Sequence, residues 1–291
     1  MKKLLMIVMA VLVCTACEKP VFDELIGEDV EVSDLPTKKF TFTVKGDFGA
    51  AVFNTRGYLT ADGQDMTDLW VFDFMDGTCV QKVHQTSSDA DWGKPQMNLQ
   101  YGSHHVYFVA SRGDSPTVDE DGHTIVWDIP RDTFYKDYEV TVVSTSNGNR
   151  AVTLDRVATK LRITANDEVP ANCASVSVTP ASWYYGINYT TGDAVSNQRK
   201  ERVVQVPSSY IGTSGQLVVN FYGLSDADEW TTNIAIQAKD GSGNVIGSAN
   251  ISGAPFRRNR ATEYSGNLFQ SGGALDVSVN AEWESSFVGA W

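Results

Sequence analysis

The sequence predicts an all-β protein built from two antiparallel β-sandwich domains. Segments with apolar or β-branched residues at every second position recur from residue 39 almost to the end of the chain. Polar turns such as Asp76-Gly77 and Asn147-Gly148-Asn149 separate these segments, and no long segment has the apolar period of a helix. Many short strands joined by polar turns are typical of antiparallel sandwiches and not of alternating strands and helices.

Residues 1–16 predict a lipoprotein signal peptide. A short positive start precedes the apolar run at residues 4–13, which has the length of a secretory signal and is too short to cross a bilayer. Cys17 follows two small residues, which resembles the lipobox of bacterial lipoproteins, although Cys14 stands where leucine is more usual. We therefore expect acyl chains on Cys17 to anchor the chain at the outer membrane. The alternative is that Cys17 is an ordinary residue lost near a standard cleavage site.

Residues 17–38 predict an acidic tether, and the remainder predicts two domains. The tether is rich in Asp, Glu and Pro and has few large side chains. The polar turn at residues 144–150 separates two series of strand-like segments, so we expect domains at residues 39–149 and 150–291. Strands are predicted at residues 39–46, 69–75, 105–111, 123–129, 156–165, 173–180, 202–207, 216–224, 232–240, 244–252 and 274–283.

Charge and cysteine content limit the classes of partner. The net charge of −13 argues against a nucleic acid or an anionic lipid surface, because a polyanion would be repelled from most of this protein. Two cysteines remain beyond the signal segment, Cys79 and Cys173, and they lie far apart in the sequence. A disulfide between them would suit an oxidising compartment, but two separate thiols packed as small apolar groups are the simpler interpretation.

The histidines and serines predict neither a metal site nor a catalytic nucleophile. His104 and His105 are adjacent, so on a strand they face opposite sides of the sheet. His84 and His123 have no ligand partner at a fixed spacing. No serine lies in a G-x-S-x-G pattern, and the acidic turns lack the calcium-loop pattern. We therefore expect no enzyme activity, no metal and no cofactor.

The aromatic group Trp183, Tyr184 and Tyr185 supports two interpretations. Sugars stack on exposed aromatic rings, so these residues are the candidate contacts of a surface glycan-binding protein. Sandwich cores also use large aromatics, and alternate rings of a strand point inward. Four further aromatic residues are interpreted as core: Trp70, Phe72, Phe74 and Trp127.

Several segments carry a resemblance to a known family. They are residues 257–262, 266–269 and 274–284, and, further upstream, residues 68–77, 101–111 and 156–178. Together they resemble the fimbrillin superfamily of Bacteroidetes, and most closely its FimB/Mfa2-type fimbrial lipoprotein subunits. The resemblance implies two tandem transthyretin-like sandwiches without enzyme activity. It also implies assembly or adhesion at the cell surface, with other fimbrial subunits as partners through strand exchange and a host or bacterial surface ligand.

The resemblance further implies that a trypsin-like protease removes an N-terminal strand from some subunits, which opens a groove for a neighbour's strand. The candidate cleavage points here are Lys38, Lys39, Lys45 and Arg56. A cut after Arg56 would remove the strand at residues 39–46 together with the lipid. We expect no cut, which favours an anchor or accessory subunit. The C-terminal segment from Leu275 is either the last strand of its own sheet or a donor to a neighbour.

Overall fold

The computed structural model describes residues 35–46, 58–59, 65–112, 115–270, 275–276 and 285–288. In these residues the chain forms strands β1 to β22 and one short 3-10 helix, η2 (Ser208–Tyr210). The prediction of an all-β sandwich fold is therefore confirmed. No helix in the described part of the chain has the length and apolar character needed to cross a membrane.

A seven-stranded sheet forms the N-terminal body, in the order β5-β4-β7-β10-β11-β1-β6. The bounds of its strands are β1 Thr37–Gly46, β4 Asp68–Met75, β5 Thr78–Thr86, β6 Gln96–Gln100, β7 Gly102–Ser111, β10 Thr133–Val142 and β11 Asn149–Arg156. Strand β11 is the corner of the sheet, because its first part pairs with β1 whereas Asp155 and Arg156 pair with β10. The sheet thereby folds into two layers, β6-β1-β11 and β10-β7-β4-β5. A separate small hairpin joins β2 (Tyr58–Leu59) and β3 (Asp65–Met66).

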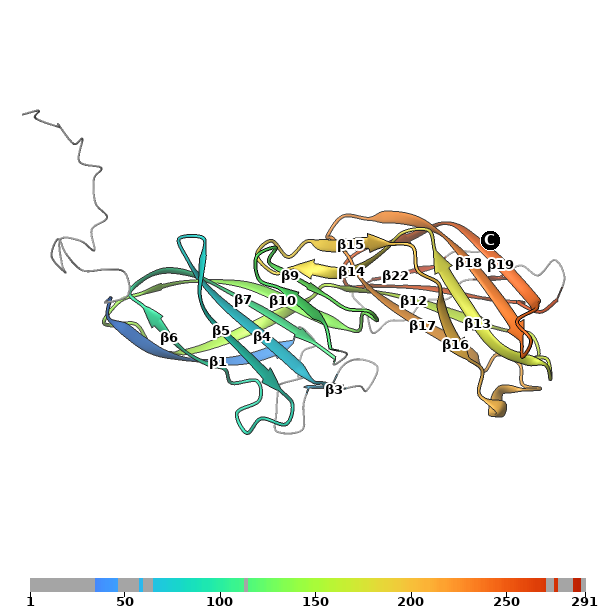
Figure 1. Cartoon of the computed structure of the whole chain (residues 1–291), viewed down its shortest axis with the longest axis horizontal. Helices are drawn as coiled ribbons and strands as arrows, with labels where there is room; N and C mark the ends of the chain where they lie inside the picture. The colour runs from blue at the N-terminus through green and yellow to red at the C-terminus, as the bar shows by residue number, and fades with distance from the viewer. Residues whose placement is uncertain are drawn as a thin grey trace, which may run out of the picture.

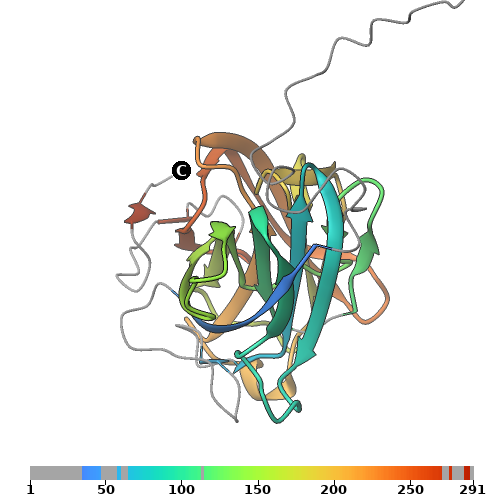
Figure 2. The same cartoon turned by 90° about the vertical axis from the view of Figure 1, so that its left-hand side faces the viewer.

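The core of the N-terminal body lies between these two layers. Alternate residues of each strand enter it, as the period of two requires. Figure 2 views this body end-on and shows the blue β1 alongside the green and cyan strands of the same body. The buried core residues are Phe40, Phe42, Val44, Met66, Leu69, Val71, Trp92, Met97, Leu99, Val106, Phe108, Ala110, Phe134, Val142, Val152 and Leu154.

The C-terminal body is a sandwich of a nine-stranded and a four-stranded sheet. The larger sheet has the order β21-β20-β12-β17-β14-β9-β8, with β15 beside β14 and β22 beside β20, and the smaller has the order β16-β13-β18-β19. The bounds are β8 Thr117–Asp119, β9 Thr124–Val126, β12 Ala158–Ala165, β13 Cys173–Pro180, β14 Trp183–Asn188, β15 Ala194–Gln198, β16 Arg202–Gln205, β17 Leu217–Leu224, β18 Trp230–Asp240, β19 Val245–Phe256, β20 Arg260–Gly266, β21 Leu275–Asp276 and β22 Ser285–Val288. One cluster of buried apolar residues from both sheets joins them.

The sheets divide the chain differently from the expected boundary between residues 149 and 150. Strand β11 belongs to the N-terminal sheet, where it pairs with β1, although it begins at Asn149. Strands β8 and β9 precede that boundary but belong to the C-terminal sheet, where β9 pairs with β14. Strand β1 begins at Thr37, so it includes the last two residues of the predicted tether. Pairing between strands that are far apart in the sequence decides which sheet each strand joins. The alternation of residues within a single strand does not reveal this pairing.

Aromatic residues join the two bodies, which lie end to end (Figure 1). Phe72 of β4 stacks on Tyr189, which follows β14, with ring centroids 4.0 Å apart. Trp70 of β4 meets Trp127, which follows β9, edge to face at 6.2 Å. The aromatic residues of β4 that the sequence analysis interpreted as core are therefore buried, but they fill the contact between the bodies and not the inside of the N-terminal body.

Candidate strand-addition site

Strand β1 is hydrogen-bonded along both of its edges. Its C-terminal half runs parallel to β11, and its N-terminal half runs antiparallel to β6. The loop that precedes β6 continues this pairing: the amide of Phe42 donates to the carbonyl of Pro95, and that of Val44 donates to the carbonyl of Gly93, both at 3.0 Å. An N-terminal strand thus completes the layer of which β6 and β11 are the other members.

Alternate side chains of β1 fill the centre of the N-terminal core. Phe40, Phe42 and Val44 are all fully buried. The Phe42 ring meets Phe108 edge to face at 5.2 Å and Tyr138 at 6.0 Å. Full burial of such a side chain contributes about 1.5–3 kcal/mol. Loss of β1 would therefore expose a long apolar groove and leave β6 without its partner strand.

The lysines predicted as cleavage points lie inside this pairing. Lys38 is opposite Leu99 and Lys39 is opposite Asn98 in the antiparallel ladder with β6. The Lys38 ammonium also donates to the carbonyl of Ser144 at 2.7 Å. A protease needs an unpaired segment, so cleavage here requires β1 to separate locally from β6. The predicted lipidation residue Cys17 and the cleavage candidate Arg56 lie outside the described residues.

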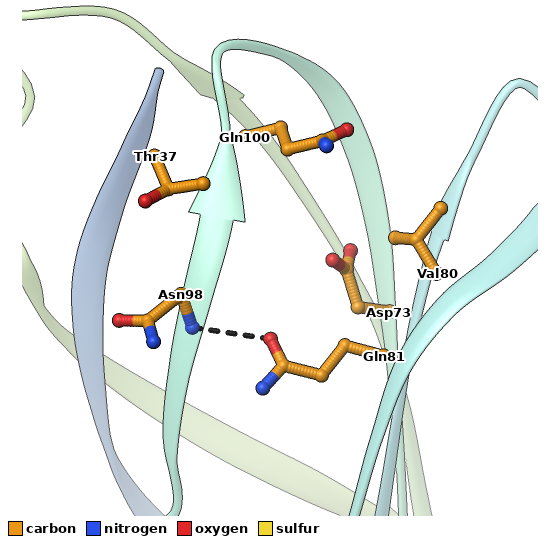
Figure 3. Close-up of a pocket in the computed structure, with 6 residues that line it drawn as sticks. All are labelled: Thr37, Asp73, Val80, Gln81, Asn98 and Gln100. Atoms are coloured by element: carbon orange, nitrogen blue, oxygen red, sulfur yellow. Dashed lines mark hydrogen bonds between the residues drawn. The ribbon is translucent and has the colours of Figure 1, made fainter. Parts of the chain in front are cut away.

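The two end strands of the N-terminal sheet, β5 and β6, approach each other at a seam. The backbone amide of Asn98 on β6 donates to Oε1 of Gln81 on β5 at 3.1 Å, so a side chain joins the two edges where no neighbouring strand does. Figure 3 shows Gln81 extending from β5 toward Asn98, beside a cavity of about 240 Å³. The cavity is lined by Thr37, Asp73, Val80, Gln81, Asn98 and Gln100.

A buried carboxylate and imidazole lie beside this cavity. Asp73 and His104 are both almost completely buried, and Nδ1 of His104 lies 2.7 Å from Oδ1 of Asp73. The other ring nitrogen lies 2.8 Å from the carbonyl of Gln100. Burial lowers the pKa of His104, but the hydrogen bond and charge of Asp73 outweigh it, so the pKa is raised above its usual value. This pair therefore favours a protonated histidine in the folded protein.

This pair is not evident from the sequence pattern, although the sequence carries one signal of it. Asp73 interrupts the apolar strand segment at residues 69–75, on the face that also carries Leu69 and Val71. A charged residue at an inward position needs a partner, because an unpaired buried charge is costly. That His104 is the partner follows from the pairing of β4 with β7, which no local pattern reveals.

The aromatic group proposed for glycan contact is mostly core. Trp183 is fully buried, and its indole N–H donates to the carbonyl of Tyr222 at 3.0 Å. Tyr185 is also buried, and burial raises its pKa to about 12. Tyr184 is half-buried and packs edge to face on Trp230. The rings of Trp183 and Tyr185 are too buried to stack on a sugar, so the structure corrects the glycan interpretation of these two residues.

The free thiols and the C-terminal segment are also placed by the structure. Cys79 is exposed on β5 and Cys173 is buried on β13, and both are free. The described parts of the C-terminal segment pair with the chain's own β20, antiparallel through β21 and parallel through β22. These described parts therefore belong to the chain's own sheet.

The fold and the completed N-terminal layer define a two-body, all-β protein of sandwich architecture. The chain belongs to the family of unknown function DUF6562, whose model matches residues 116–288. No curated protein matches it at a significant level.

Solved structures with similar folds come from Bacteroidetes. A candidate adhesin from Bacteroides ovatus is 11% identical with a TM-score of 0.52, covering 90% of this chain and 98% of its own. A fimbrial assembly protein from Parabacteroides distasonis is 13% identical with a TM-score of 0.48, covering 89% and 100%. The fimbrial anchor protein Mfa2 from Porphyromonas gingivalis is 10% identical with a TM-score of 0.46, covering 75% and 83%. At 11% identity, the likeness to the candidate adhesin from Bacteroides ovatus shows a shared fold.

Proposed function

We propose that this protein is a fimbrillin-like surface subunit that acts in fimbria assembly or cell adhesion through β-strand addition. One observation carries the proposal: the N-terminal strand β1 completes a core layer with three fully buried apolar side chains. When subunits join edge to edge, a strand from the neighbouring subunit either replaces a strand of this kind or leaves it in place. The fold shared with the candidate adhesin from Bacteroides ovatus supports the same class.

We further propose the anchor or accessory type, held at the outer membrane by lipid on Cys17. The ladder with β6 protects the backbone at Lys38 and Lys39, which supports a subunit that keeps β1. Retention of β1 would leave an end strand of the C-terminal body, such as β16, for contact with the next subunit. The function is structural and not enzymatic, in keeping with the adhesin that shares the fold.

The experiment is intact-mass analysis and N-terminal mapping of the protein isolated from membranes of the cells that make it. We expect a chain that begins at acylated Cys17, retains residues 37–46 and is extracted in complexes with other surface subunits. The variant Cys17→Ser should release the chain from the membrane. The variant Arg56→Ala should give the same lipidated, uncleaved chain, with a mass that differs only by the substitution.

Two results would count against this assignment. A lipid-free chain that begins at Gly57 would identify a polymerising stalk or tip subunit and refute the anchor type. A lipid-free, complete monomer that forms no complexes would refute the surface subunit as a whole.

A further inference from the structure

Three possible metal ligands meet on the outer face of the N-terminal sheet. His105 on β7 lies directly opposite Glu139 on β10, and Tyr107 lies opposite Asp137. Because side chains alternate along a strand, His105, Asp137 and Glu139 all project from the same face. The backbone of His105 is paired on both sides, with β4 and with β10, and the backbone of Asp137 and Glu139 is paired with β7.

The distances between the ligand atoms suit a small divalent cation. One ligand atom from each of the three residues lies within 4.8 Å of the other two. Nδ1 of His105 lies 3.1 Å and 3.3 Å from the two carboxylate oxygens of Asp137. Two ligands on a tetrahedral zinc ion, each about 2.0–2.1 Å from the metal, are about 3.3–3.4 Å apart. His105 and Asp137 thus already have the required spacing, and the exposed Glu139 reaches them by rotation of its side chain.

The electrostatic surroundings also favour a cation. Among the described residues, the ion-pair partner of Asp137 is His105, and no lysine or arginine pairs with Glu139. A divalent cation would neutralise both carboxylates.

The orientation of the histidine is supported by neighbouring rings. The His105 ring stacks on Tyr107 at 5.9 Å with an interplanar angle of 19°. Tyr107 in turn packs edge to face on Phe74 at 5.3 Å. Packing that fixes the orientation of a ligand lowers the entropy lost when a metal binds, as in other metal sites with a supporting outer layer.

We propose that His105, Asp137 and Glu139 bind a divalent transition-metal ion of the zinc class, with water in the remaining coordination position. One imidazole and two carboxylates are ligands that zinc accepts, and three protein ligands leave an open position. Calcium is disfavoured, because it takes six to eight oxygen ligands and this group offers too few. The sequence predicts no metal site, because no histidine has another histidine as a suitable partner. In the proposed site the partners of His105 are instead two carboxylates on the neighbouring strand β10.

The test is calorimetric titration of the full, tag-free chain with zinc chloride, and separately with manganese and calcium chloride. Cys14→Ser, Cys17→Ser and Cys79→Ser are included in every variant, because free thiols are themselves zinc ligands. We expect one zinc ion bound per chain, manganese bound more weakly and no calcium. Each of His105→Gln, Asp137→Asn and Glu139→Gln should weaken zinc binding at least about tenfold, since even outer partners of metal ligands contribute 10–100-fold.

His84→Gln is the matched control. His84 is similarly exposed and lies 2.8 Å from Asp68, but that pair belongs to no group of three potential ligands in the described chain. The control should bind zinc like the parent. Equal zinc affinity in His105→Gln and the parent, or no binding to the parent at millimolar zinc, would overturn the proposal. The side chains of His105 and Asp137 are 48% and 36% exposed and Glu139 is exposed, so loss of folding is not expected, and circular dichroism of each variant checks this.

Discussion

At the scale of single residues, the His104–Asp73 pair predicts pH-dependent stability. The folded-state pKa of His104 is raised above its unfolded value, so its stabilising contribution is complete below the unfolded pKa. That contribution is lost as the pH rises through the folded-state pKa. We expect Asp73→Asn to lower the free energy of unfolding by about 1.5–3 kcal/mol at pH 5.5 and to flatten its pH dependence.

Urea unfolding between pH 5.5 and 9 measures this effect. His84→Gln is the control, because the exposed His84–Asp68 pair contributes only about 0–1 kcal/mol. An equally steep pH dependence in Asp73→Asn and the wild type would show that another group is responsible.

Gly223 lies against the ring of Trp183, so we expect no larger residue to fit at this position. A Cβ atom at Gly223 would lie 2.4 Å from Nε1 of Trp183, and that ring is fully buried and hydrogen-bonded. Gly223→Ala should therefore destabilise the protein by about 1–3 kcal/mol, the usual cost of overpacking. Gly241 has open space around it, so Gly241→Ala should change stability by less than about 0.5 kcal/mol. Thermal unfolding of the two variants compares them directly.

At the scale of the strands, the buried side chains of β1 are expected to limit how often β1 separates from β6. Phe42→Ala removes a fully buried ring that contacts Phe108, so it should lower the free energy of unfolding by about 3–5 kcal/mol. It should also speed trypsin cleavage at Lys38 and Lys39, because β1 separates from β6 more often. Thr43→Ala, on the half-buried opposite face, is the control. Equal cleavage rates in both variants would show that opening of β1 does not limit proteolysis.

The strands also show which features of the fold can be predicted from the sequence. The alternation at residues 39–46 predicts both a strand and the inward face of Phe40, Phe42 and Val44, because a period of two is a local property. The placement of β9 in the C-terminal sheet is not predicted, since its pairing with β14 joins Ile125 to Ile187. The meeting of His105 with Glu139 depends on register in the same way. Such pairings are set by the packing of the whole chain.

At the scale of the whole molecule, the aromatic contact predicts that the two bodies unfold together. Tyr189 is buried and stacks on Phe72, and Gly192, nearby in the same turn, leaves room for Tyr135. Large apolar contacts between bodies restrict their relative motion, whereas small polar ones do not. The wild type should therefore show a single calorimetric transition.

Tyr189→Ala should divide that transition in two, because it removes the stacked ring and leaves the cores of both bodies intact. Ile236→Val is the control, since Ile236 lies in the core of the C-terminal body and should cost only about 0.5–1.5 kcal/mol without separating the transitions. Scanning calorimetry distinguishes these results. A single transition in Tyr189→Ala, merely shifted to lower temperature, would mean that the remaining contacts, such as that of Trp70 with Trp127, suffice to couple the bodies.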